Sequence, residues 1–241
     1  MSRTRVDHIL ASILAQPHPD PRWTLPDALC AACAADLPVS GVALALMTEQ
    51  GHVGLVAATD TRATTMEDLQ FSLGEGPCID ASVRGRPVIQ PELRSSGPIR
   101  WPAFGPAAVE AGIEAIFAFP LQVGAIRLGV LDLYRDTSGT LTPEALTEAL
   151  AYADAAVRVL LHLQDEMPLD GGLHPDLGRA PSRPEVHQAT GMIAVQSGVR
   201  LADALLLLRA RAYSSGTSVT QVARAVVART LRFDPDIAHD G

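Results

Sequence analysis

Apolar residues near the start of the chain recur at the spacing of amphipathic helices. Val6, Ile9 and Ile13 follow this spacing, and the alanine-rich segment 26–36 predicts a second helix. From Gly41 onwards the apolar positions become almost continuous and are interrupted by turn-forming residues, which favours buried strands joined as hairpins. The predicted strands are 41–48, 52–59, 115–123 and 127–135, with shorter helices and a short strand at 87–90 between the two hairpins. This order predicts an α+β fold in which helices flank an antiparallel sheet.

A long helix is predicted at 142–166, because Thr142 is a good N-cap and Pro143 suits the first helical position. Its apolar residues form a heptad seam, which is typical of helices that pair with each other. Two interpretations remain open: the seam pairs with a second copy of the chain and gives a homodimer, or it packs on the chain's own sheet. In the homodimer the pairing residues are Leu146, Leu150, Val157 and Leu160.

A domain boundary is predicted where Pro and Gly accumulate. Residues 168–184 hold four Pro and three Gly in 17 positions, a linker composition. Three short helical patterns follow, and the third begins at Ser218, whose partner Gln221 completes a capping box. The predicted organisation is an α+β domain at 1–166 that includes the helix 142–166, a linker at 167–183 and a small all-α three-helix domain at 184–233.

Charge is distributed unevenly along this chain, whose net charge is -8. Residues 1–168 contain 11 Arg and 20 acidic residues, whereas residues 183–232 contain 7 Arg and 2 acidic residues. A compact basic helical module in an acidic protein is typical of nucleic-acid binding, although a charged helix face is often only solvated. The chain has no lysine, and arginine suits phosphate groups and base stacking better than lysine does.

The string VHQATGMIAVQSGVRLADALLLLRARAYSSGTSVTQVARAVV resembles the ANTAR domain, the RNA-binding module of bacterial transcription antitermination regulators. The resemblance implies a dimer that holds paired RNA hairpins in a nascent transcript and prevents a terminator hairpin from forming. The family often has a basic residue where this chain has Thr190 and a Ser cap where it has Arg200. Small residues at 189, 191, 204 and 212 are expected to let the helices approach closely. The expected RNA contacts, all taken as exposed, are Gln188, Thr190, Arg209 and Arg211.

The N-terminal part resembles a GAF domain, a small-molecule-sensing fold with a six-stranded antiparallel sheet. The matching strings are LGEGPCIDA, GRPVIQPEL, WPAF and FAFPLQVGAIRLGVLDLYR, and none of them identifies the ligand. The resemblance implies a pocket for a small molecule, or a site for a protein partner, between the sheet and the loop-helix layer. The residues expected near it are Cys78, Trp101, Phe104 and Phe119. A GAF domain, a helix and an ANTAR domain in this order resemble an actinobacterial class of regulators.

The three cysteines are candidates for a disulfide, a redox site or a metal site. Their odd number argues against a disulfide framework. Cys78 begins a short helix, whose dipole would lower the thiol pKa and suit a redox sensor; the alternative is a small buried residue. Cys30 and Cys33 form a C-x-x-C without a second ligand pair. We therefore expect no metal, no cofactor and no catalytic residues.

Two other functions remain possible, and the sequence also predicts a cellular location. The rivals are a cysteine-based methionine sulfoxide reductase of GAF fold and a DNA-binding regulator. The sequence contains no apolar run near the roughly 18 residues of a membrane span and no secretory signal at its start, which predicts a cytoplasmic protein.

Overall fold

A computed structural model describes residues 3–15, 20, 23–48, 51–165 and 184–233 of the chain. The chain divides into two compact units. The first comprises Met1–Phe71 and Glu75–Ser182, and the second comprises Arg183–Gly241 with the short segment Ser72–Gly74. The predicted linker at 167–183 lies outside the described residues.

The first unit is built on one antiparallel sheet. The two predicted hairpins are confirmed, β1 with β2 and β4 with β5, and β5 also pairs with β1. In the described part of the chain the sheet has five strands in the order β2-β1-β5-β4-β3, not the six that the family resemblance implied. The strands are β1 (Gly41–Thr48), β2 (Gly51–Ala58), β3 (Val88–Gln90), β4 (Ala115–Val123) and β5 (Ile126–Arg135).

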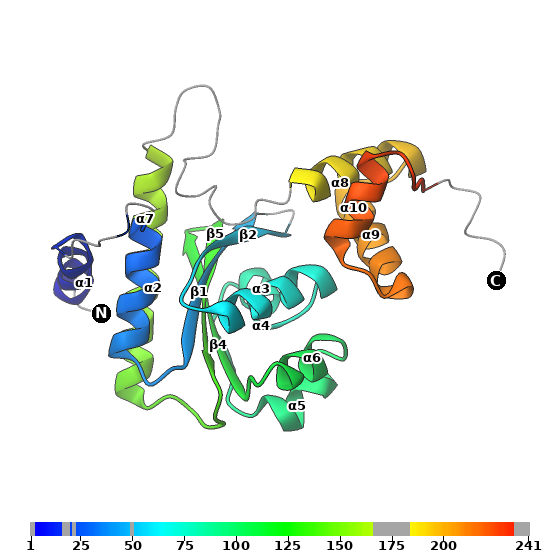
Figure 1. The fold of residues 1–241 in the computed structure, drawn as a ribbon. Helices are drawn as coiled ribbons and strands as arrows, with labels where there is room; N and C mark the ends of the chain where they lie inside the picture. Colours follow the sequence, from blue (N-terminus) through cyan, green and yellow to red (C-terminus); the bar gives the residue numbers. More distant parts are fainter. Residues whose placement is uncertain (1–2, 16–19, 21–22, 49–50, 166–183, 234–241) are drawn as a thin grey trace. The chain divides into compact units, whose positions relative to one another are not determined.

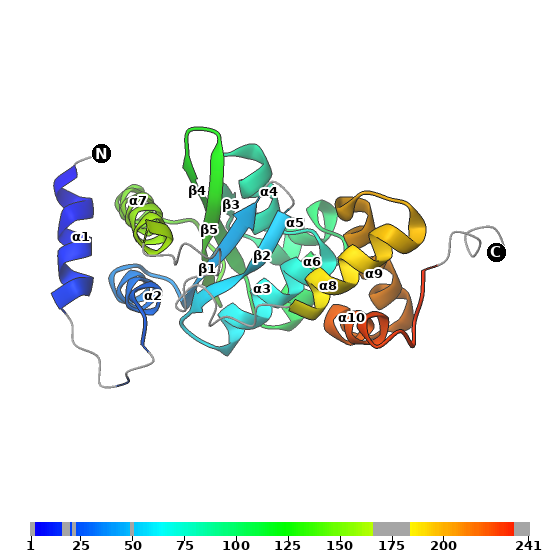
Figure 2. The same cartoon turned by 90° about the horizontal axis from the view of Figure 1, so that it is seen from above.

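Helices cover both faces of this sheet (Figures 1 and 2). On one face lie α2 (Leu25–Asp36) and α7 (Pro143–Asp165), and α1 (Arg3–Ala15) packs on their outer side. On the other face lie α3 (Thr61–Leu73), α4 (Pro77–Arg84), α5 (Leu93–Arg100) and α6 (Phe104–Glu110). We call these two sides the α7 face and the α4 face. Because both faces are covered, the central strands are buried on both sides, as their nearly continuous hydrophobic sequence predicts.

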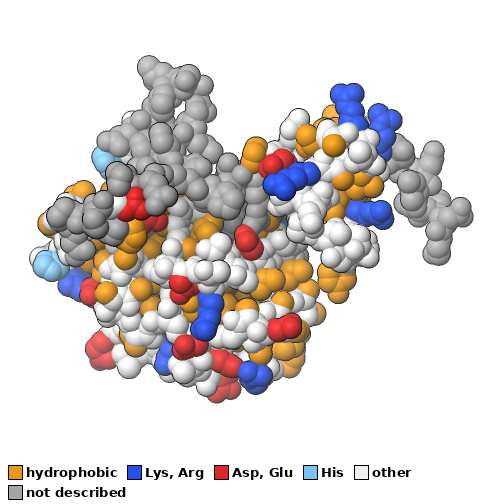
Figure 3. Space-filling view, viewed as in Figure 1, with side chains coloured by type: hydrophobic (Ala, Val, Ile, Leu, Met, Phe, Trp, Pro, Cys, Tyr) orange, Lys and Arg blue, Asp and Glu red, His pale blue; other side chains and the backbone are white. Residues whose placement is uncertain are grey.

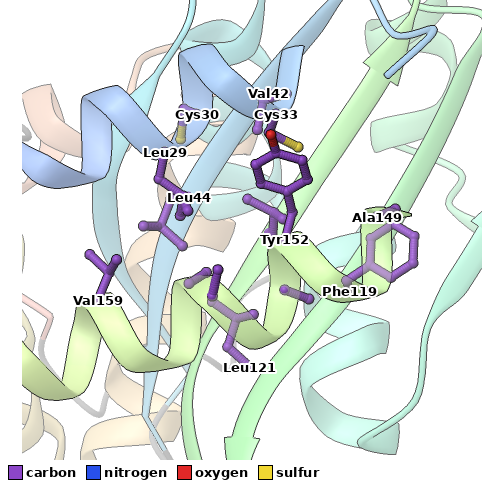
Figure 4. Close-up of a cluster of buried hydrophobic side chains, with 14 of the residues drawn as sticks. Leu29, Cys30, Cys33, Val42, Leu44, Phe119, Leu121, Ala149, Tyr152 and Val159 are labelled. Carbon is purple, nitrogen blue, oxygen red and sulfur yellow. The ribbon is translucent and has the colours of Figure 1, made fainter. Parts of the chain in front are cut away.

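The main hydrophobic core lies between the sheet and the α7 face. Figure 4 shows Leu29 from α2, Phe119 from β4 and Tyr152 from α7 in one cluster of buried side chains. The Tyr152 ring is buried, and its hydroxyl donates a hydrogen bond of 2.7 Å to the Asp36 carboxylate at the end of α2. Alternate β4 residues project to this side because side chains alternate along a strand.

The seam of α7 packs largely on the chain's own core. Leu160 is fully buried, and a Cβ placed on Gly129 of β5 would lie 3.4 Å from its Cδ1 atom, so Leu160 covers the sheet. The expectation that Leu160 pairs with a second copy is therefore wrong, because the sheet already covers this side chain. Leu146, Leu150 and Val157 are half-buried and border the same core, so they keep part of their surface accessible.

The second unit consists of α8 (Pro184–Ser197), α9 (Leu201–Ser215) and α10 (Val219–Val227), as predicted. Gly198 and Gly216 follow α8 and α9 with φ of +67° and +63°, a left-handed conformation that glycine adopts at little cost. The predicted capping box between Ser218 and Gln221 is present at the start of α10. Besides four alanines, the buried apolar side chains among the described residues of the unit are Val186, Ile193, Leu208, Val219, Val222 and Val226.

None of the helices that the structure describes is by itself long and apolar enough to cross a membrane. The pair α8 and α9 would suffice together by length and composition, but it is bent by 105° at the intervening break.

The hydrogen bond between Tyr152 and Asp36 provides a test of the α7 face. Tyr152→Phe should lower the free energy of unfolding by about 1 kcal/mol, because it removes one hydrogen bond and leaves the ring in place. Tyr213→Phe is the matched control, since Tyr213 is 75% exposed. Urea denaturation of the whole chain measures both changes. An equal loss of unfolding free energy in the two variants would show that the hydrogen bond from Tyr152 to Asp36 does not stabilise the unit.

Candidate functional sites

Arginines dominate the charge on the surface of the second unit. Arg200 and Arg224 form ion pairs with Asp203 and Glu185 at 3.3 Å and 3.5 Å. The other exposed arginines have no acidic partner among the residues that the structure describes; they are Arg211, Arg229 and Arg232. Figure 3 shows Arg side chains standing out from this unit. This excess of unpaired positive charge suits a polyanion.

The four predicted RNA contacts differ in their accessibility. Gln188 of α8 and Arg211 of α9 are exposed, whereas Arg209 is half-buried. The expectation that Thr190 is exposed is wrong: its side chain is 8% exposed, and its hydroxyl donates a 2.7 Å hydrogen bond to the Val186 carbonyl one turn earlier in α8. Thr190 therefore belongs to the helix packing of the unit and is not available as an RNA contact.

Small residues of the second unit have two different environments. Ala189, Ala204 and Ala212 are buried, as expected for close helix approach. The same expectation is wrong for Gly191, because a Cβ at this position would meet no atom within 4 Å. Gly191 lies inside α8, where glycine costs helix stability, and no packing in the described structure requires it.

An exposed apolar strip on α9 was missed by the sequence reasoning. Leu206 is 64% exposed and Tyr213 is 75% exposed, and the exposed Ala210 lies between them on the same helix face. These three residues are spaced by four and three positions, as on one helix face, and the sequence shows this spacing. They alternate with the buried residues of α9. An exposed tyrosine close in sequence to Arg211 combines stacking with charge, which is typical of surfaces that bind unpaired RNA bases.

In the first unit, Cys78 lies in the first turn of α4 and is fully buried. Its backbone N–H donates a 2.7 Å hydrogen bond to the Gln70 side-chain oxygen, and its Sγ lies 3.9 Å from Met47 Sδ. The expectation that the helix dipole lowers the thiol pKa is wrong. Burial raises the pKa of the Cys78 thiol well above its usual range, and Asp132 and Glu67 raise it further. The thiol is therefore a poor nucleophile in this environment.

Two buried carboxylates accompany Cys78, and the sequence reasoning did not bring them together. Glu67 of α3 and Asp132 of β5 are 1% and 0% exposed. The ligand atoms of Glu67, Cys78 and Asp132 all lie within 4.8 Å of one another. Burial raises the pKa of Asp132 well above its usual range, and the neighbouring Glu67 raises it further. We call these three residues the buried acid-thiol cluster.

The aromatic residues of the predicted ligand pocket separate onto the two faces of the sheet. Trp101 and Phe104 are buried and make an edge contact with ring centroids 6.1 Å apart. The Glu75 carboxylate, in the loop before Cys78, accepts hydrogen bonds of 2.6 Å and 2.7 Å from the Ala103 and Phe104 backbone N–H groups. Phe119 was wrongly expected beside them: it belongs to the core of the α7 face, because successive strand residues project to opposite sides.

A cavity of about 810 Å³ lies on the α7 side of the unit, between α1, α2 and α7. Arg5, Asp36 and Glu148 are among its lining residues. The Arg5 guanidinium forms hydrogen bonds with Glu148 and lies 3.6 Å from the Asp36 carboxylate. This cavity is not the predicted pocket, which the resemblance placed near Cys78.

Comparisons with known proteins give a match for each part of the chain. Residues 178–227 match the ANTAR domain family model. The GAF domain of an Acinetobacter phosphoenolpyruvate-protein phosphotransferase is 16% identical with a TM-score of 0.51, covering 68% of this chain and 98% of that one. The GAF domain of the Coxiella burnetii phosphotransferase is 17% identical with a TM-score of 0.52, covering 68% and 94%. These likenesses show the fold of the first unit.

A further similar structure is the type II free methionine-R-sulfoxide reductase from Thermoplasma acidophilum, 13% identical over 66% of this chain and 96% of that one. Its TM-score is 0.43, which supports no inference about this chain. The comparison with curated proteins found no match.

The open environment of Gly191 leads to a stability prediction. Gly191→Ala should raise the free energy of unfolding by about 0.5–1 kcal/mol, because alanine restricts the unfolded chain and meets no neighbour in α8. Gly105→Ala is the contrasting control: its Cβ would collide with the Gly97 backbone and should destabilise the first unit. Thermal denaturation followed by circular dichroism measures both, and a destabilised Gly191→Ala would show that this position is not open.

Proposed function

We propose that this chain, in which an ANTAR domain follows a GAF-fold unit, is a signal-responsive RNA-binding regulator of transcription antitermination. The match of residues 178–227 to the ANTAR family is the observation that supports it most strongly. In this proposal the GAF-fold unit at 1–166 senses a small molecule or a partner protein in the cytoplasm, 167–183 is a linker, and 184–233 binds paired RNA hairpins of nascent transcripts. The proposal includes a homodimer and no enzymatic activity.

The RNA contacts that we propose are those that the second unit leaves accessible. Arg211 would contact phosphate groups or a base edge, and Gln188 would donate and accept hydrogen bonds to bases. Tyr213, in the exposed strip of α9, would stack on a base that the hairpin loop leaves unpaired. Arg209 is half-buried and would contribute only through the part of its side chain that remains exposed.

Strand β5 offers a route from the sensor interior to α7. Asp132 projects toward α3 and α4, whereas Leu131 and Leu133 belong to the core that α7 covers. A change in packing around Asp132 would therefore be transmitted through β5 to α7, and we propose that it alters how α7 pairs with a second copy. The pairing would use the half-buried residues Leu146, Leu150 and Val157.

Cysteine-based reduction of methionine sulfoxide is disfavoured by the environment of the thiols. That chemistry needs an accessible thiolate, but Cys30, Cys33 and Cys78 are all buried. Burial raises the pKa of each of the three thiols. Cys30 and Cys33 also belong to the core of the α7 face, away from the face on which Cys78 lies.

RNA binding is tested by titrating the whole chain with a two-hairpin RNA and with a DNA duplex of matched length at one salt concentration. Arg211→Ala and Tyr213→Ala should each weaken RNA binding by about 5- to 150-fold, since one stacked base or one charged contact contributes about 1–3 kcal/mol. Arg211→Ala should also lower the salt dependence of binding by about one phosphate contact, whereas Tyr213→Ala should leave it unchanged.

Arg94→Ala is the control for general loss of charge, because Arg94 is an exposed arginine of the first unit, paired with Glu114. It should leave RNA affinity unchanged. Equal affinity for the DNA duplex would favour the rival DNA-binding regulator. Unchanged RNA affinity in both α9 variants would show that α9 is not part of the RNA-binding surface.

The proposed pairing of α7 is tested by light scattering. Leu150→Asp combined with Val157→Asp should convert a dimer into a monomer, because two charges would then lie in an apolar interface. Leu161→Asp is the matched control: Leu161 is also on α7 and 37% exposed, but it is not a seam residue. Circular dichroism confirms that each variant is folded. A wild-type chain that is monomeric at all concentrations would contradict pairing through α7.

A further inference from the structure

The buried acid-thiol cluster joins three elements that are distant in sequence. Glu67 comes from α3, Cys78 from the first turn of α4 and Asp132 from the middle of β5. Each side chain is at least 99% buried, and their ligand atoms lie within 4.8 Å of one another. Neither the GAF fold nor the proposed RNA binding explains why two carboxylates and a thiol converge in the interior of this unit.

The Asp132 carboxylate has an unusual environment. It is completely buried, and neither of its oxygens accepts a hydrogen bond of normal geometry from a residue that the structure describes. The groups that influence its ionisation are Glu67, Cys78 and Gln70, none of which is a cation. Burial and a second carboxyl group both disfavour the charged form of Asp132, and a cation bound between the two groups would stabilise it.

We infer that Glu67, Cys78 and Asp132 form a binding site for one divalent metal ion of the zinc class. Two carboxylate oxygens and one thiolate are a mixed set of hard and soft donors, which suits Zn²⁺ and its substitute Co²⁺. Ca²⁺ and Mg²⁺ prefer a larger set made of oxygen ligands alone. The inference concerns the GAF-fold unit by itself and does not depend on RNA binding.

The distances fit such an ion after a small adjustment. In a tetrahedral zinc site, with ligand bonds of about 2.0–2.3 Å, neighbouring donor atoms lie about 3–4 Å apart. Donors already within 4.8 Å would have to close by only about 1–2 Å at most. Met47 Sδ lies 3.9 Å from Cys78 Sγ, so a thioether also borders the cluster.

Gln70 holds two members of the cluster in place. Its side-chain nitrogen donates a 3.0 Å hydrogen bond to Glu67, and its oxygen accepts the 2.7 Å hydrogen bond from the Cys78 backbone. Gln70 is itself fully buried. Polar partners of this kind orient metal ligands and restrict their side chains, which reduces the cost of assembling the site. Metal binding would displace the protons that the thiol and the carboxyl groups hold, and these would pass to solvent.

The experiment uses the untagged full-length chain, stripped with a chelator, dialysed and then titrated with Co²⁺. The wild-type chain should bind about one Co²⁺ and develop a thiolate-to-cobalt charge-transfer absorption, which requires a cysteine ligand. Mass spectrometry of the bound metal gives the stoichiometry. Zn²⁺ should displace Co²⁺ and abolish the absorption.

Three variants identify the ligands. Cys78→Ala should abolish the charge-transfer absorption, and Asp132→Asn should weaken Co²⁺ binding by at least about tenfold. Asp132→Asn has the shape of the native side chain and removes a buried charge, so the metal-free variant should fold, as circular dichroism can check. Cys30→Ala is the matched control, because Cys30 is an equally buried thiol on the α7 face. It should bind Co²⁺ as the wild-type chain does.

Two results would overturn the inference. A wild-type chain that binds no Co²⁺ would show that the buried acid-thiol cluster is not a metal site. Co²⁺ bound equally by the wild-type chain, Cys78→Ala and Asp132→Asn would place the metal at another site.

Discussion

The architecture of the GAF-fold unit depends on an antiparallel sheet that is buried on both faces. Because side chains alternate along each strand, every central strand contributes to two separate interiors. In β4 and β5 one set of positions, with Phe119 and Leu133, forms the core under α2 and α7. On the alternate positions of β5, Asp132 projects toward α3 and α4. One strand therefore connects a mainly apolar core with an interior that contains buried carboxyl groups.

The two interiors differ in what they contribute. The α7 face contains closely packed apolar side chains, and its few polar groups are satisfied at the edge, as in the hydrogen bond from Tyr152 to Asp36. The α4 face contains two carboxylates and a thiol without a compensating cation on Asp132. A protein gains no stability from such a cluster, so its presence points to a role in function. A resident or sensed metal ion would give the cluster that role.

The second unit is small, and its core depends on buried alanine and valine side chains between α8, α9 and α10. Glycines end α8 and α9, and a capping box begins α10, so the chain turns sharply between short helices. Because the core is small, most arginines and the strip formed by Leu206, Ala210 and Tyr213 lie at the surface. Basic and aromatic groups that the core does not need remain available for a nucleic acid.

The sequence by itself determined the elements that depend on local periodicity and capping. These include the two hairpins, the helix that begins after Thr142 and the helices α8, α9 and α10, together with the family of the C-terminal part. Tertiary structure decided which face each residue occupies. It assigned Phe119 to the α7 core, covered Leu160 and Thr190, and brought Glu67, Cys78 and Asp132 together. Strand pairing and helix packing join residues far apart in the chain, and no local pattern contains that information.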